Sequence, residues 1–226
     1  MEYRPSGLFN DIPSSHDRAD IGTSVVRRVS WRAANAIILK YEWLGSMAMK
    51  TTDCFGIYFG GFLAGVCCFS PPPTPHVAMG AIGKDHVNLV KVLSRGACVW
   101  WAHEHSASKL ISLATKIMVS ETRYRVFLAF SDPRAMEIGT VYQASNWIYT
   151  GITNSHTSYF IGGAWRTERS ARQESYRIAG IDFRKCPKKK EPGKHRYLKL
   201  DAPTKRERQY IRGLIRYEGL PYPKRT

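Results

Sequence analysis

The sequence predicts one mixed α/β (α+β) domain, in which helices flank a central sheet, followed by a basic C-terminal extension. Three observations support this prediction. Strand-like and helix-like patterns alternate along residues 24–162, and no internal repeat is visible. The 226 residues are enough to bury a sizeable core in one domain. Positive charge is concentrated in the last quarter of the chain. We therefore expect three parts: a flexible N-terminal arm (1–20), a catalytic domain (21–165) and the extension (166–226).

The first elements follow the N-terminal arm, whose residues carry prolines, serines and mixed charge without an apolar period. Ser24 to Val29 reads as a strand. Ser30 is a suitable N-cap for the helical pattern that follows, which we expect to run to Gly45.

A hairpin is predicted next. Two β-rich runs, Phe55–Phe59 and Phe62–Phe69, are separated by Gly60-Gly61, a dipeptide typical of tight hairpin turns. We interpret Pro75 to Lys84 as a loop of small residues and Val87 to Leu93 as a strand that ends before Arg95.

The second half of the domain begins with an amphipathic helix at Ala107–Thr122, which Ser106 or Ser108 can cap. A strand is predicted at Val126–Ser131 and a short helix at Pro133–Ser145. Two further strands are expected at Trp147–Ile152 and Ser158–Gly162.

The charge balance points to a polyanionic partner. The chain has 34 Lys and Arg against 18 Asp and Glu, a net charge of +16, and residues 166–226 hold 19 of the basic and 7 of the acidic residues. Nucleic acid fits better than an anionic membrane, because no hydrophobic anchor accompanies the charge. A merely solvated basic surface is the alternative.

Within the extension, Cys186 to Lys194 is basic and proline-containing and is predicted to be a loop, and Arg196 to Leu200 a short strand. Thr204 and Glu207 form a capping box that opens a helix to about Tyr217. Its arginines recur every four residues and share one face, while apolar residues cover another.

The sequence argues against several common classes of protein, including disulfide-rich proteins, nucleotide-binding proteins, hydrolases and zinc proteases. The five cysteines are odd in number and lack a CxxC pair, and the common nucleotide, dinucleotide, hydrolase and zinc-protease motifs are missing. His103 and His105 suggest a metal site at first, but a third ligand is not evident, so no metal site is assigned. Without an apolar run of membrane length or a secretory signal, we expect a soluble intracellular protein.

One segment carries candidate chemistry. Asp132-Pro133 ends an apolar strand, so the carboxylate is presented at a strand tip, where it can serve as base or acceptor or simply cap the next helix. Tyr142 follows and can stack, donate a proton or pack in the core. Arg95, after another strand, can clamp a phosphate or carboxylate or form an internal ion pair.

The run from Ser131 to Gly151, SDPRAMEIGTVYQASNWIYTG, resembles the signature of bacteriophage Mom-type DNA modification proteins. Supporting similarities span most of residues 41–225; they lie at Tyr41–Met47, Leu93–Arg95, His105–Ser108, Lys194–Tyr197 and Pro221–Arg225.

The resemblance implies a fold like that of the GCN5-related N-acetyltransferases (GNATs), with a mostly antiparallel mixed sheet. It also implies modification of the adenine N6 amine in phage DNA to a carbamoylmethyl (glycinamide-like) derivative, which protects the DNA from restriction in the cytoplasm of the bacterial host. The family's catalytic positions fall on Arg95, Ser108, Asp132 and Tyr142. We expect Arg95, Gly96 and Ser108 to hold the donor. DNA contacts are expected from the following residues: Trp43, Lys188, Lys189, Lys190, Lys194, Arg196, Arg208, Arg212 and Arg216.

The sequence departs from the family pattern at two places. Glu42-Trp43 stands where the family has His-Tyr, so a role of that histidine, including a role in binding iron, is not carried over. The acetyltransferase pyrophosphate loop is missing after Arg95. The donor therefore stays open among acetyl-CoA and related acyl or glycyl donors, and a homodimer is one option for the oligomeric state. Two alternative functions remain: an N-acetyltransferase acting on another amine, and a non-catalytic DNA-binding protein.

Overall fold

The computed structural model describes residues 20–178 and 180–224, so the expected N-terminal arm at residues 1–20 lies outside the described residues except for Asp20. A seven-stranded sheet has the order β1-β2-β3-β4-β5-β10-β6, and a three-stranded sheet has the order β8-β7-β9. The strands of the large sheet are β1 Val25–Arg28, β2 Asp53–Phe59, β3 Phe62–Ser70, β4 Val90–Cys98, β5 Val126–Ser131, β6 Ile148–Ile152 and β10 His195–Leu200. The small sheet contains β7 His156–Ile161, β8 Ala164–Thr167 and β9 Lys188–Glu191.

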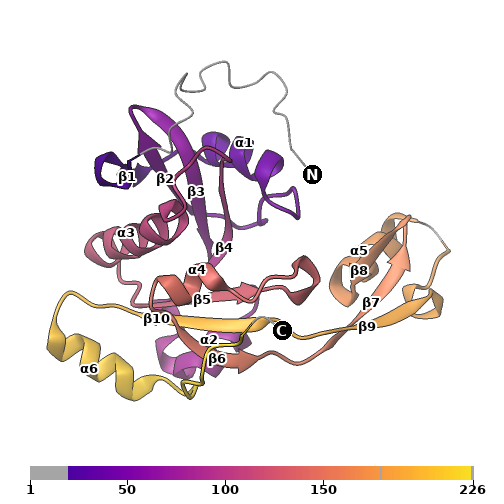
Figure 1. Ribbon diagram of the computed structural model, residues 1–226. Helices are drawn as coiled ribbons and strands as arrows, with labels where there is room; N and C mark the ends of the chain where they lie inside the picture. The colour runs from indigo at the N-terminus through magenta and orange to yellow at the C-terminus, as the bar shows by residue number, and fades with distance from the viewer. Residues whose placement is uncertain (1–19, 179, 225–226) are drawn as a thin grey trace.

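Helices cover both faces of the large sheet (Figure 1). On one face, α1 (Trp31–Tyr41) and α3 (Ser106–Glu121) bury Ile37, Leu110 and Met118 in the main core. On the other, α2 (Pro75–Ile82) and α6 (Lys205–Leu214) pack Ile82 and Ile211 against β4, β5 and β10. In the described part of the chain, β4–β5 is the one parallel strand pair. The predicted mixed, mostly antiparallel sheet flanked by helices is confirmed.

The first elements match the prediction closely. Ser30 caps α1, since its hydroxyl accepts a hydrogen bond from Ala33 N at 3.2 Å. Gly60 and Gly61 have φ of 54° and 90°, the left-handed conformations that a tight hairpin turn requires. The helix ends at Tyr41, earlier than the expected Gly45.

The prediction of a loop at Pro75–Lys84 is wrong, because most of this segment forms α2. Proline at the first helical position starts the helix, and Ala78 and Ala81 bury its inner face. The short 3-10 helix η2 (Lys84–Leu89) follows, so β4 begins only at Val90.

The segment after β5 is also more broken than predicted. The expected helix at Pro133–Ser145 is divided into a 3-10 turn, η3 (Pro133–Ala135), and a short helix, α4 (Thr140–Ala144). Met136 and Gly139 between them have positive φ, which interrupts a continuous helix.

The C-terminal extension is not an outer layer. Its strand β10 lies between β5 and β6 in the large sheet, and the expected boundary at residue 165 falls within β8. The basic segment at Cys186–Lys194, predicted to be a loop, contains β9. Because β9 is an edge strand, its lysines remain in solvent.

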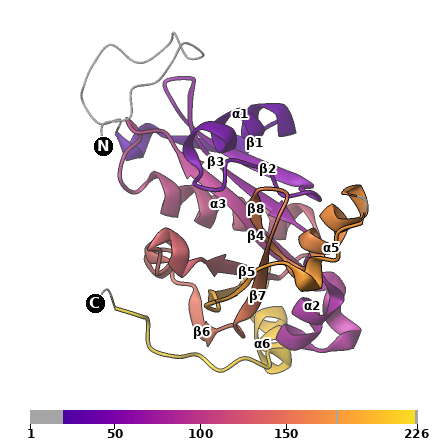
Figure 2. The same ribbon diagram turned by 90° about the vertical axis from the view of Figure 1, so that its right-hand side faces the viewer.

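The small sheet forms a separate projection, which we call the lateral arm: β7, β8, α5 (Glu168–Arg177), η4 (Phe183–Lys185) and β9, residues 156–191. Its own core contains Ile161, Ala171 and Phe183. The lateral arm projects to one side in Figure 1 and faces the viewer in Figure 2, in front of β4 and β5. Within the described ranges, no helix has the length and apolar character needed to cross a membrane.

Candidate active site

A large cleft opens where the two parallel strands separate. The pairing of β4 with β5 ends where Leu93 lies opposite Ala129. Beyond that point residues 94–98 pair with β3, whereas Phe130 and Ser131 pair with β10. Residues of both strands line the resulting cleft, which has a volume of about 1710 Å³.

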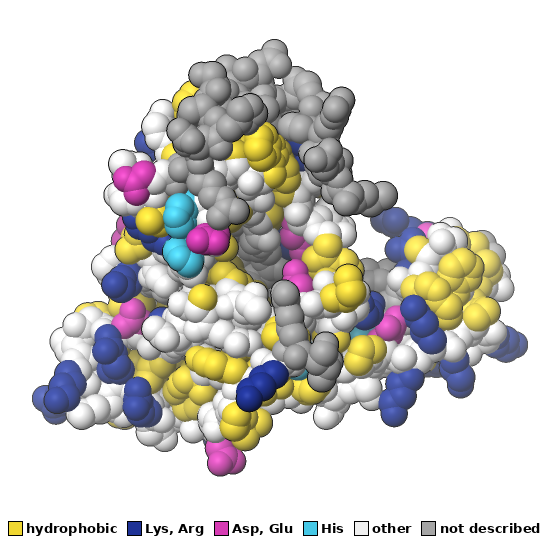
Figure 3. All heavy atoms as spheres, viewed as in Figure 1, with side chains coloured by type: hydrophobic (Ala, Val, Ile, Leu, Met, Phe, Trp, Pro, Cys, Tyr) yellow, Lys and Arg dark blue, Asp and Glu magenta, His cyan; other side chains and the backbone are white. Residues whose placement is uncertain are grey.

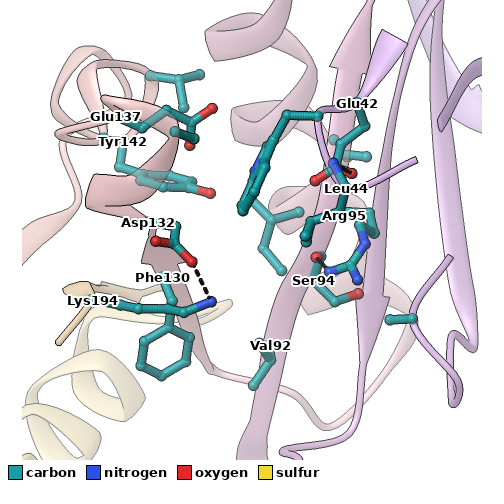
Figure 4. A pocket seen from close by; sticks show the side chains of 18 of the residues that line it. Glu42, Leu44, Val92, Ser94, Arg95, Phe130, Asp132, Glu137, Tyr142 and Lys194 are labelled. Carbon is teal, nitrogen blue, oxygen red and sulfur yellow. Dashed lines mark hydrogen bonds and ion pairs between the residues drawn. The ribbon is translucent and has the colours of Figure 1, made fainter. Parts of the chain in front are cut away.

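Most of the predicted site residues meet in this cleft. It is lined by Trp43, Arg95, Gly96, Asp132, Tyr142 and Lys194, among others. Figure 4 shows Asp132, Glu137, Tyr142 and Lys194 on one wall and Glu42, Ser94 and Arg95 on the other. Residues that are up to about 150 positions apart in the sequence therefore share one site.

Ser108 has a different environment. Its neighbour Ala107 lines the cleft, but the Ser108 hydroxyl donates to His105 O at 3.0 Å, within the first turn of α3. The N-cap position of α3 is His105, so the predicted caps at Ser106 and Ser108 are wrong. The geometry gives Ser108 a local structural contact and does not bring it to the donor site.

Arg95 lies within β4, not beyond its end, because Cys68 of β3 pairs with it. Its guanidinium donates from Nε to Ser46 O and from Nη1 to Ser94 O, both at 2.6 Å. It therefore holds the loop after α1 against β4, and the alternative of an internal ion pair is not found among the described residues.

Asp132 satisfies both interpretations of its position, since it caps η3 and also lines the cleft. It is 4% exposed and accepts hydrogen bonds from Arg134 N at 3.0 Å and Arg134 Nη2 at 2.7 Å. Lys194 Nζ lies 2.9 Å from the carboxylate (Figure 4). Burial opposes ionisation, but hydrogen bonds from Arg134 and Lys194 outweigh it and hold the pKa of Asp132 well below its usual range. Asp132 is thus an ionised acceptor and a weak base.

Tyr142 points into the cleft from α4 (Figure 4). Its ring packs against Trp147 and Tyr197, with centroid distances of 5.4 and 5.1 Å. Burial, followed by the negative charge of Glu137, raises the pKa of Tyr142 above its usual value. The phenol is therefore neutral and can donate a hydrogen bond.

Glu137 is a candidate that the sequence interpretation missed. It lines the cleft between η3 and α4, and burial together with the charges of Glu42 and Asp132 raises its pKa. A carboxylate with a raised pKa accepts a proton more readily than Asp132 does. No local sequence pattern predicts the raised pKa of Glu137, because one of the charges that raises it, Glu42, lies on the opposite wall of the cleft.

Trp43 is 48% exposed at the cleft and lies 5.8 Å from the guanidinium carbon of Arg134. It also lines a smaller pocket with Trp100, which is 54% exposed. The exposed indole of Trp43 at the cleft can stack on a planar ligand.

The predicted DNA-contacting residues fall into three places. Lys194 lies in the cleft, and Lys188, Lys189 and Lys190 are on the lateral arm. Arg196 donates to Thr150 Oγ1 and Thr150 O at 2.9 and 2.8 Å, so its guanidinium group makes hydrogen bonds within the fold.

The remaining three arginines belong to the region of α6. Arg208 forms an ion pair with Asp201 at 2.7 Å, and Arg212 is exposed. Arg216 lies beyond the end of α6, so the predicted stripe of three arginines on one helix is reduced to two.

A metal site finds no support in the part of the chain that the structure describes, where no group of three or more His, Cys, Asp or Glu side chains could hold an ion. The rings of His103 and His105 are 5.2 Å apart, and His103 Nδ1 accepts from His105 N at 3.0 Å. This pair does not supply a complete ligand set.

The fold defines an α/β protein with a large cleft at the divergence of two parallel strands, the kind of place where ligands commonly bind. The Mom protein family matches residues 23–224. The chain belongs to this family. No curated protein sequence matches it.

Solved N-acetyltransferase structures are similar in overall fold. The IAA acetyltransferase from Bacillus cereus ATCC 14579 is 11% identical, with a TM-score of 0.46 over 79% of this chain and 99% of that chain. A GNAT family acetyltransferase from Elizabethkingia anophelis with acetyl-CoA bound is 6% identical, with the same TM-score and coverage. The spermidine N-acetyltransferase from Vibrio cholerae in complex with CoA and spermine is 8% identical, with a TM-score of 0.45 over 79% and 96% of the two chains.

Proposed function

We propose that this protein is a transferase that converts adenine in double-stranded DNA to its N6-carbamoylmethyl derivative, using a small-molecule donor bound between β4 and β5. In the phage-infected cell this modification would protect the DNA from restriction. One observation carries the proposal: a single cleft combines an unpaired strand edge with Asp132, whose pKa is lowered, and with Glu137 and Tyr142, whose pKa values are raised. Family membership supports the choice of DNA adenine as the acceptor.

The unpaired edge suits the donor. From Ser94 to Cys98, β4 has no strand partner on the side of β5 in the described chain. An extended donor with amide groups can bind such an edge as an added strand. The chain RGACVWWAHE after this point lacks a glycine-rich pyrophosphate loop, so the fit covers the amide arm of an acyl-CoA but not its pyrophosphate. The donor is therefore a carbamoylmethyl donor, in which an amide-containing arm is joined through a leaving group to a methylene that carries a carboxamide.

The acidic wall suits an exocyclic amine. The adenine N6 lone pair is delocalised into the ring, so the amine needs an acceptor for its protons as it attacks. Asp132, ionised and fixed by Arg134, accepts a hydrogen bond from the amine, and Glu137 takes the proton. The carbon that N6 attacks must be a methylene that carries a carboxamide, since attack on an acyl or glycyl carbonyl would give an N6-acyl adenine. The bond from N6 to this methylene forms as the bond from the methylene to the leaving group breaks, and Tyr142 protonates the leaving group. Proton transfer from Glu137 to Tyr142 then restores both residues.

Access to a base inside a duplex requires base flipping, which costs a few kcal/mol. Stacking on Trp43 at the cleft and phosphate contacts from Lys194 and the lateral arm can offset that cost. The steps above use only side chains of this chain together with the donor and the base.

Analysis of modified nucleosides in DNA from cells that express the protein tests this function. We expect a modified adenine with wild type, and at least about a hundredfold less with Glu137→Gln, since a positioned general base contributes on that order. Glu218→Gln is the control, because Glu218 is exposed and does not line the cleft. Unmodified adenine together with acetylation of another amine would favour an N-acetyltransferase with a different substrate. Full biological activity without any modification would favour a non-catalytic DNA-binding protein.

A further inference from the structure

The lateral arm carries a basic surface whose charge is not balanced internally. Residues 156–191 hold nine Lys and Arg against four Asp and Glu. The acidic side chains are occupied within the fold: Glu168 pairs with Arg172, Glu174 with Arg166, and Glu191 with Lys189, while Asp182 caps η4. Among the described residues, no ion pair is found for Lys188, Lys190 or Arg169. Such a surface is complementary to a polyanion.

The lateral arm also exposes two large aromatic side chains on adjacent strands. Phe160 and Trp165 are opposite each other across β7 and β8, with ring centroids 5.5 Å apart, and are 42% and 44% exposed. Lys189 Nζ lies 4.6 Å from the Trp165 ring. Figure 3 shows hydrophobic side chains gathered on the lateral arm, with Lys and Arg side chains around them. An apolar pair surrounded by cations is typical of a surface that inserts between nucleic-acid bases.

This aromatic face continues into the cleft. Side chains alternate along a strand, so Trp165 and Thr167 lie on the same face of β8, and Thr167 lines the cleft. The opposite face of the small sheet packs Ile161 against Ala171 and Phe183. The lateral arm is also tied to the Asp132 loop, because Arg134 lies 3.7 Å from Glu191 and 2.7 Å from Asp132.

We propose that the lateral arm is the base-opening element of this protein: Arg169, which lines the cleft, and Lys189, which the alternation of β9 places on the same face as Trp165, bind the phosphates of a DNA duplex, while Phe160 and Trp165 wedge into a base step beside the cleft. The substrate presented to Asp132 is then a base already displaced from the stack. This inference rests on the proposed function for the identity of the acceptor, but the unstacking itself can be measured without the donor.

The test uses the full chain and a short DNA duplex in which 2-aminopurine, whose fluorescence rises when it is unstacked, replaces adenine. Binding is followed by fluorescence anisotropy at several salt concentrations. We expect wild type to bind and to raise the 2-aminopurine signal. Phe160→Ala with Trp165→Ala should abolish the rise while weakening binding by no more than about tenfold, as expected when one base is no longer stacked. Tyr210→Ala, which removes a 60% exposed aromatic on α6, is the matched control and should change neither.

The charge component has its own pair of variants. Arg169→Ala with Lys189→Ala should reduce the slope of log affinity against log salt by about two, because two phosphates are no longer neutralised by these side chains. Lys205→Ala with Arg206→Ala, two exposed basic residues of α6 that are not among the expected DNA contacts, should leave that slope unchanged. The inference is overturned if wild type gives no 2-aminopurine rise, if the aromatic double variant retains it, or if the α6 pair governs binding. Unmodified cellular DNA with a normal 2-aminopurine response would instead refute the proposed function and leave the lateral arm's role standing.

Discussion

At the scale of single residues, the site is defined by three acidic groups whose pKa values are shifted in different directions. Asp132 is ionised by its contacts with Arg134 and Lys194, whereas the pKa values of Glu137 and Tyr142 are raised by burial and neighbouring charge. Groups whose pKa values are driven apart in one cleft are suited to opposite roles in proton transfer. The sequence predicted Asp132 and Tyr142 but gave no sign that Asp132 is too acidic to be the base.

Asp132 should make the stability of the protein depend on pH in a defined direction. Its folded pKa lies below the ordinary value of 3.8, so its contribution is complete above about pH 5 and is lost as the pH falls through 3.8 towards the folded pKa. Asp132→Asn should therefore lower the free energy of unfolding by about 2 kcal/mol near neutral pH, the scale of hydrogen bonds to a charged group. Urea denaturation at neutral pH and at about pH 3 measures this difference. A gap between wild type and variant that stays constant on acidification would contradict the assignment.

At the scale of elements, the position of Tyr142 depends on the broken segment between β5 and α4. Gly139 is the residue before α4 and has a φ of 78°, and a Cβ at this position would collide with the Tyr197 ring. The tight packing of the segment on β10 is what directs the phenol into the cleft.

Gly139→Ala should therefore destabilise the protein and reduce DNA modification together. Gly163→Ala on the lateral arm is a matched control, since Gly163 has a φ of 73° but nothing lies within 4 Å of its Cβ position. The left-handed conformation costs both variants about 1 kcal/mol, and only Gly139→Ala adds a clash. Thermal unfolding should show a clearly larger loss for Gly139→Ala. Equal losses would show that the contact with Tyr197 does not matter.

How far the sequence predicted these elements depended on whether their signals were local. The cap at Ser30, the Gly60-Gly61 hairpin and the apolar period of α3 are local, and all three were confirmed. α2 was missed because small residues and prolines suggested a loop, although Ala78 and Ala81 are buried by the sheet. β9 was missed because its lysines are compatible with a strand only at a sheet edge. Glu137 and the interior contacts of Arg95 and Arg196 depend on distant segments, which no local pattern reveals.

At the scale of the whole molecule, the C-terminal residues complete the large sheet and the cleft. β10 lies beside β5 and places Lys194 next to Asp132, while the preceding residues form the lateral arm beside the cleft. The basic charge of the C-terminal quarter is thus divided among the cleft, the lateral arm and α6. We infer that the fold brings the DNA-contacting lateral arm and the donor-binding strands to opposite sides of one acceptor site.

The central claim is that the N6 amine of adenine is the nucleophile in this cleft. Mass spectrometry of nucleosides from DNA labelled with nitrogen-15 at adenine N6, isolated after modification by wild type and by Tyr142→Phe, tests it most directly. We expect a modified adenine that retains the label with wild type and is strongly reduced with Tyr142→Phe. A modified adenine that has lost the label, or no modified adenine with wild type, would contradict it.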